Sequence, residues 1–214
     1  MPLPVNRAAG QTITAADINA IAAAVNLAAL TPMAYTAPSG AWNMPTHVVG
    51  SGAGAPASGT VYWTPMNVGP QDLPLQALGV NCTTAYAGTS ATLTLGIYKD
   101  DGTGGMPLLT SAGLVVSGAT GALTTTGTKQ YTFTATLTPG RYWLASLLVA
   151  TGQTTAAQFQ CVSTSTNLWL PGTATLGGLS KALAVASQTV LPTSAVTMAY
   201  TNSTVAPTVH FRTA

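Results

Sequence analysis

The clearest pattern of hydrophobic and polar positions lies in residues 128–151, TKQYTFTATLTPGRYWLASLLVAT. Its first half alternates threonines with apolar residues, which are Tyr131, Phe133, Ala135 and Leu137. A period of two predicts a strand with one buried face. Residues 142–149 are apolar except for Ser146, which predicts a central strand covered on both faces. Because Pro139 and Gly140 favour a tight turn, we predict a hairpin at the middle of an antiparallel β-sandwich.

Similar patterns predict further strands at residues 61–64, 73–84, 92–98, 108–116, 158–163, 195–200 and 205–212. In three of these strands a spacing of two places the apolar residues on one face. The sets are Leu78, Val80 and Cys82 in the second strand, and Leu93, Leu95 and Ile97 in the third. In the last strand Val209 and Phe211 lie on the face opposite His210 and Arg212. Short strands at this spacing predict an all-β fold over residues 59–214, an antiparallel β-sandwich or jelly roll. Residues 164–190 are predicted to be a loop, with room for a short helix over residues 179–186.

Ahead of the β region, residues 1–30 predict an extended arm followed by a short N-terminal α-helix that begins at Thr14. Apolar residues recur along this helix at spacings of three, four and three, at Ile18, Ile21, Val25 and Ala28. Isoleucine at both core positions of such a heptad-type stripe favours three or more associating helices. We therefore predict an oligomerisation or anchoring helix and a homotrimer, with packing of the helix on its own domain as the alternative. Residues 31–58, rich in proline, glycine, alanine and serine, predict a linker.

Charge is scarce in this chain of 214 residues, of which only 5% are charged and none is glutamate. Ordinary domains are about 25% charged, so solubility must come from hydroxyl and amide groups, including those of 37 threonines. Such a surface suggests that much of it is covered by other subunits. The net charge of +2, without a basic cluster, argues against a nucleic-acid partner.

The N-terminal region carries neither a leader nor a membrane-span pattern. Residues 1–14 lack the apolar core of a signal peptide. Residues 15–30 are interrupted by Asp17, Asn19 and Asn26 and are too short and too polar to span a bilayer. We expect synthesis in the cytosol and no membrane insertion.

No enzyme signature is found. Asp100 and Asp101 lie in a glycine-rich stretch that predicts a turn, because a calcium site needs more oxygen ligands than this loop offers. His47 and His210 have no accompanying nucleophile motif. We therefore expect no catalytic residue, no cofactor and no metal. Cys82 and Cys161 lack zinc-ligand spacing and are interpreted as two buried thiols, with a disulfide as the alternative.

Four tryptophans could in principle stack on sugars, and they are Trp42, Trp63, Trp143 and Trp169. Trp143 lies in the strand that is apolar on both faces and is expected in the core. Trp169, in the loop sequence NLWLPG, is the best exposed candidate for ligand contact, with packing under that loop as the alternative.

Two passages resemble known proteins. The opening GQTITAADINAIAAAVN resembles the N-terminal segment of virion proteins of tailed phages, especially minor tail and fibre proteins of phages of actinobacteria. The block LGIYKDDGTGGMPLL, followed by LTPGRYWLASLLVAT, resembles a jelly-roll domain of phage fibre and capsid-surface proteins. The resemblance implies a trimeric, non-enzymatic structural protein of the virion, with other virion proteins as partners.

Within that family we expect one of two roles. The first is a short tail fibre or minor tail protein that contacts host glycans. The second is a capsid decoration protein that stabilises the head. A carbohydrate-binding module is a lesser alternative, and the missing signal peptide argues against its secreted form.

Overall fold

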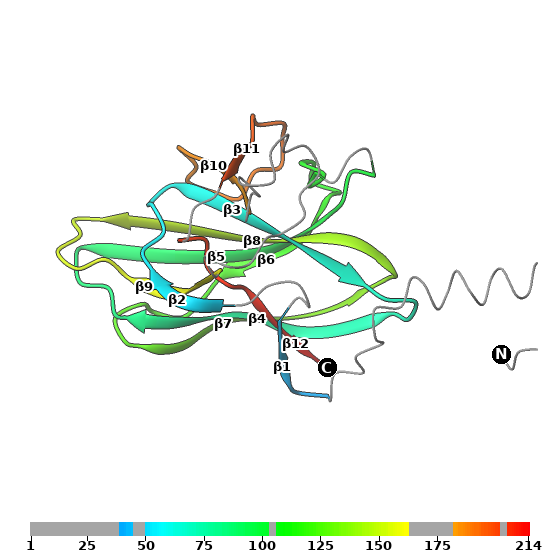
Figure 1. The fold of residues 1–214 in the computed structure, drawn as a ribbon, viewed down its shortest axis with the longest axis horizontal. Coiled ribbons are helices and arrows are strands. Elements are labelled where there is room, and N and C mark those ends of the chain that lie inside the picture. The colour runs from blue at the N-terminus through cyan, green and yellow to red at the C-terminus, as the bar shows by residue number, and fades with distance from the viewer. Residues whose placement is uncertain (1–38, 45–49, 103–105, 163–181, 202–204) are drawn as a thin grey trace, which may run out of the picture.

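The computed structural model describes residues 39–44, 50–102, 106–162, 182–201 and 205–214 as two antiparallel β-sheets packed face to face (Figure 1). No helix occurs in these residues, so the prediction of an all-β fold is confirmed for them. The predicted N-terminal helix lies outside the described residues, together with its stripe of Ile18, Ile21, Val25 and Ala28.

The first sheet, sheet A, is organised around β4 (Leu73–Thr84). Along one edge, β4 pairs with β7 (Gly127–Leu137). Along the other edge it pairs first with β12 (His210–Thr213) and then with β9 (Gln158–Val162). The outer strands are β1 (Trp42–Asn43), which pairs with β12, and β2 (Gly50–Gly54), which pairs with β9.

The second sheet, sheet B, has β8 (Gly140–Thr151) at its centre, between β3 (Thr60–Val68) and β5 (Ser90–Lys99). The remaining strands, which extend the sheet from β5 and from β3, are β6 (Leu114–Ala119), β10 (Ala182–Val185) and β11 (Ala199–Thr201).

The main core lies between the two sheets. It contains Leu75, Leu78, Val80, Cys82, Leu137 and Phe159 from sheet A, and Met66, Leu93, Leu95, Ile97, Leu144 and Leu148 from sheet B. The predicted inward-facing sets of β4 and β5 are therefore confirmed. So is the burial of Val209, beside which Phe211 packs on the same core.

A second core covers the outer face of sheet B. Its buried side chains include Val61, Trp63, Tyr98, Trp143, Ala145, Leu147, Leu183 and Leu191. Residues 186–198, here called the covering segment, cross this face. Leu191 packs on Gly96 of β5, and the hydroxyl of Tyr98 donates to the Pro192 carbonyl at 2.8 Å. Sheet B is therefore covered on both faces, as the apolar sequence of β8 predicts.

The predicted hairpin is wrong, although both of its strands exist. β7 pairs with β4 in sheet A, whereas β8 pairs with β3 and β5 in sheet B. Residues 138–139 thus carry the chain from one sheet to the other, not back along a partner. The reason is burial: β7 has an exposed threonine face and suits the sheet with an open side, while β8 needs cover on both faces.

Three further predictions are corrected. The strand predicted at residues 108–116 begins only at Leu114, because the amide of Gly113 donates to Thr110 and closes a turn there. The short helix considered for residues 179–186 is wrong for the described part of that range, because Ala182–Val185 forms β10, which pairs with β3. The strand predicted at residues 195–200 is confined to Ala199–Thr201.

The prediction of a linker over residues 31–58 is wrong for two short segments. Trp42–Asn43 and Gly50–Gly54 form β1 and β2, which belong to sheet A. β1 consists of two residues only, and its register is set by the C-terminal strand, with Trp42 opposite Arg212. A partner so far away in sequence leaves no local pattern, which is why composition alone suggested a linker.

The burial of Trp143 gives a test of the second core. Trp143→Ala should lower the free energy of unfolding by about 3–5 kcal/mol, because a large cavity would open under the covering segment. Val190→Ala is the matched control, since Val190 lies in the same segment and is 69% exposed. It should change stability by less than about 0.5 kcal/mol. Chemical denaturation measures both, and equal midpoints for the two variants would contradict the structure.

Candidate functional site

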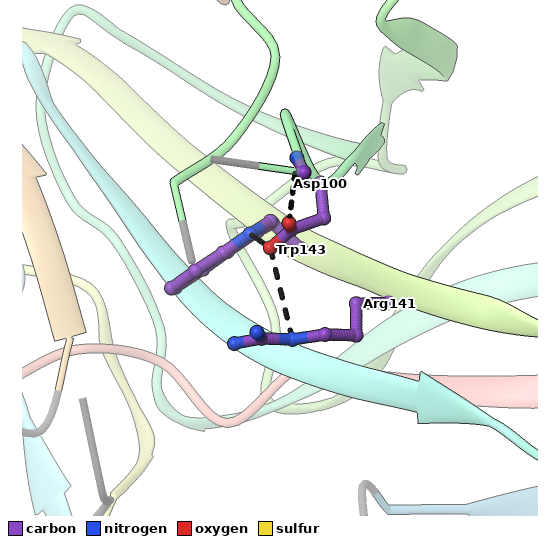
Figure 2. Close-up of polar contacts among 4 residues, drawn as sticks. Asp100, Arg141 and Trp143 are labelled. Carbon is purple, nitrogen blue, oxygen red and sulfur yellow. Dashed lines mark hydrogen bonds and ion pairs between the residues drawn. The ribbon is translucent and has the colours of Figure 1, made fainter. Parts of the chain in front are cut away.

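The acidic turn after β5 is a structural anchor (Figure 2). The Asp100 carboxylate accepts a hydrogen bond from the indole Nε1 of Trp143 at 3.0 Å and one from the Gly102 amide at 2.9 Å. Arg141 Nε lies 3.8 Å from the same carboxylate. These contacts satisfy a buried indole N–H and fix the turn, in which Gly102 has φ +76°. These contacts are typical of a turn, in agreement with the turn predicted at Asp100 and Asp101.

The tryptophans occupy very different environments. Trp63 and Trp143 are both fully buried, which confirms the expectation for Trp143. Trp169, the predicted ligand-contact residue, lies outside the described residues. Trp42 is 37% exposed on sheet A. The sequence placed it among four tryptophans that could stack on sugars but did not single it out, because its segment was interpreted as a linker. Among the described residues, Trp42 is therefore the tryptophan available to a ligand.

Trp42 borders a groove on the outer face of sheet A. The groove is lined by Trp42, Gly79, Val80, Asn81, Thr128, Gln160 and His210, and it encloses about 180 Å³. It lies where β4 changes neighbour, since β12 pairs with β4 as far as Gly79 and β9 takes over at Cys82. The change of partner leaves a depression between strands that are otherwise continuous.

Glycine at position 79 allows the indole to lie low over β4. A Cβ atom built on Gly79 would meet Trp42 Cη2 at 2.6 Å and Cζ3 at 2.8 Å, closer than carbon atoms pack. Any larger residue at position 79 would therefore push the indole away from the sheet. Gly79 and Trp42 together set the shape of this wall of the groove.

The groove is lined by uncharged groups at neutral pH. Asn81 and Thr128 are exposed and face each other across β4 and β7, offering an amide and a hydroxyl. The neighbouring Lys129 is paired with inward-facing Val80, is only 6% exposed, and donates from Nζ to Thr125 Oγ1 at 2.7 Å. Its ammonium is thus turned away from the groove.

His210 supplies the remaining polar group of the groove. It stands opposite Gly79 in the pairing of β12 with β4. Its Nε2 is buried and has no hydrogen-bond partner among the residues that the structure describes. Burial lowers the pKa of His210 below the ordinary 6.5, so the imidazole is neutral at pH 7. A neutral imidazole can donate or accept one hydrogen bond at that atom, depending on its tautomer.

The two cysteines are buried free thiols, as predicted. Burial raises the pKa of Cys161 to about 12 and also raises the pKa of Cys82. Thiols with raised pKa values are poor nucleophiles at neutral pH. In the described ranges, no three histidine, cysteine or acidic side chains gather as a metal site would require.

Comparison with known proteins gives no match, either to a protein-family model or to a curated protein. None of the chain that the structure describes forms a helix long and apolar enough to cross a membrane.

The Asp100 anchor can be tested by a double-mutant cycle. Asp100→Ala should lower the free energy of unfolding by about 1–3 kcal/mol, because it leaves the buried N–H of Trp143 without an acceptor. In a Trp143→Phe background the same change should cost clearly less, since no N–H remains to be satisfied. Asp72→Ala, at an exposed position, serves as the control. An equal cost of Asp100→Ala in both backgrounds would show that the carboxylate acts elsewhere.

His210 gives a test by pH. Its folded-state pKa is lowered, so its contribution to stability is present above the unfolded value near 6.5 and is lost as pH falls through the folded pKa. Between pH 7 and pH 5, above the range in which carboxylates titrate, wild-type stability should fall more than that of His210→Gln. Denaturation series at several pH values measure this difference. If stability fell equally with pH in wild type and His210→Gln, His210 would be equally hydrated in the folded and the unfolded state.

Proposed function

We propose that this chain is a non-enzymatic structural protein on the surface of a tailed-phage virion, where it acts as a short tail fibre or minor tail protein that contacts host glycans. The observation that carries the proposal is the difference between the two outer faces of the sandwich. The chain covers sheet B with its own residues 186–198, whereas sheet A presents uncharged hydroxyl and amide groups around an exposed indole. An open, neutral face with an aromatic wall suits contact with sugars.

The passages that resemble phage jelly-roll domains form one unit in space. The block that contains Tyr98 and Asp100 and the block that contains Trp143 lie on β5 and β8, with Tyr98 opposite Trp143 in the register. The Asp100–Trp143 hydrogen bond joins them again at the strand ends. If the resemblance reflects a shared fold, the two halves of the motif should be in contact, as these two blocks are. We also propose that this sandwich is a jelly roll.

A homotrimer is part of the same proposal and rests on the helical stripe in residues 14–30. Three copies would multiply weak contacts with a repeated glycan, because the second and third contacts become intramolecular. Other virion proteins are the expected partners of residues 1–30.

Capsid decoration is the second candidate, and the outward face of β7 favours it. This face is a row of exposed threonines, Thr128, Thr132, Thr134 and Thr136, that is long and free of charge. Such a row could lie against a neighbouring capsid subunit and add contact area without a ligand. A carbohydrate-binding module outside a virion is the lesser alternative.

Virions that lack this protein distinguish the candidates. If it is a fibre or minor tail protein, particles without it should have intact heads but adsorb poorly to host cells. Decoration instead predicts normal adsorption and heads that burst more readily on heating or dilution. Labelling with antibody under the electron microscope should place the protein on the tail. A label confined to the head would overturn the tail assignment, and absence from virions would overturn the proposal as a whole.

The trimer is tested in solution with the full chain. Light scattering should give three times the 21.4 kDa of one chain. Ile21→Asp should reduce this mass to that of the monomer, because a charge would be buried at the three-fold axis without a partner. Asn19→Asp adds the same charge away from the stripe and should leave the trimer intact. A monomeric wild type, or a trimer that survives Ile21→Asp, would contradict the proposal.

A further inference from the structure

We infer that the groove beside Trp42 is a subsite for one uncharged sugar ring, held by the indole wall and by hydrogen bonds from Asn81, Thr128 and His210. The inference rests on the proposed contact with host glycans and gives that contact a location and a ligand class. Ligand contact through Trp169 remains a separate prediction.

The shape of the groove favours a sugar ring. The groove lies where β4 passes from β12 to β9, so the depression coincides with a change of strand partner. Gly79 lets the indole of Trp42 lie close to the strand, so one wall of the depression is aromatic. Sugars present an apolar face of C–H groups, and an aromatic side chain with one exposed surface is the usual complement to such a face.

The hydrogen-bonding groups around the groove also suit a sugar ring. The rim offers an amide from Asn81 and a hydroxyl from Thr128, both exposed on adjacent strands. His210 contributes a buried Nε2 with no partner among the described residues. An unpartnered buried polar atom costs free energy, which a ligand hydroxyl could recover by pairing with it. A few fixed polar groups beside an apolar wall are characteristic of small-ligand sites.

The absence of charged groups in the lining favours a neutral sugar. No carboxylate or ammonium lines the groove, and Lys129 turns its ammonium toward Thr125 on the other side of β7. Arg212, which stands opposite Trp42, does not line the groove, and its Nε donates to the Gly40 carbonyl at 2.9 Å. An anionic sugar would lose hydration without gaining a paired charge. The groove therefore fits a neutral ring better than a uronic acid or a sialic acid.

The test uses methyl glycosides of glucose, galactose, mannose, rhamnose and N-acetylglucosamine as probes, with methyl glucuronide as the anionic comparison. Binding to the full-length protein is followed by saturation-transfer NMR and titration. At least one neutral glycoside should bind. Trp42→Ala should weaken that binding at least tenfold, and Asn81→Ala should weaken it measurably. Met44→Ala is the matched control, because Met44 is 39% exposed close to Trp42 but does not line the groove. It should alter the affinity less than twofold.

Three outcomes would overturn the inference: no neutral glycoside binds, binding survives Trp42→Ala in a variant that melts normally, or methyl glucuronide binds best. If Trp42→Ala does not fold, Asn81→Ala and Thr128→Ala test the same groove from exposed positions. The proposed function is judged separately, by the presence of the protein on virions. A protein that is found on the tail but binds no glycoside refutes the subsite and leaves the virion role standing.

Discussion

Burial of both faces of β8 is the constraint on which the rest of the structure depends. Alternate side chains of this strand point into the main core, as Leu144 and Leu148 do, or into the second core, as Trp143 and Leu147 do. A sandwich of two sheets covers only one face of each strand, so the second face of β8 requires a third layer. The chain provides it with the covering segment, from which Leu191 and Met198 pack on the second core. Asp100 accepts a hydrogen bond from the indole N–H of Trp143, which this burial would otherwise leave unpaired.

The same constraint makes the molecule asymmetric. The outer face of sheet B is not available to a partner, because residues of the same chain cover it. In the described part of the chain the outer face of sheet A is exposed: β7 presents threonines there, and the groove beside Trp42 presents an indole, an amide and an imidazole. Fold alone does not define function, but it decides which surface remains available for one. In this chain the available surface is nearly free of charge, in keeping with its sequence.

Local patterns predicted the strands well where burial and periodicity coincide. β4 has its predicted bounds, and the inward sets of β4 and β5 lie in the main core. The pairing of β7 with β8 was not predictable from the turn sequence, because the choice of sheet depends on what covers each strand. The groove was missed for a related reason. Trp42 is placed by pairing with Arg212 and by its fit over Gly79, and neither contact leaves a periodic signal near residue 42.

We propose that the exposed face of sheet A is the recognition surface of a virion protein. Cryo-electron microscopy of intact virions tests it most directly, since the sandwich can be fitted as a rigid body into the density of the particle. We expect the sandwich on the tail, with Trp42 and Thr128 directed toward solvent and away from neighbouring subunits. A sandwich on the head whose sheet A lies against the capsid would contradict the claim.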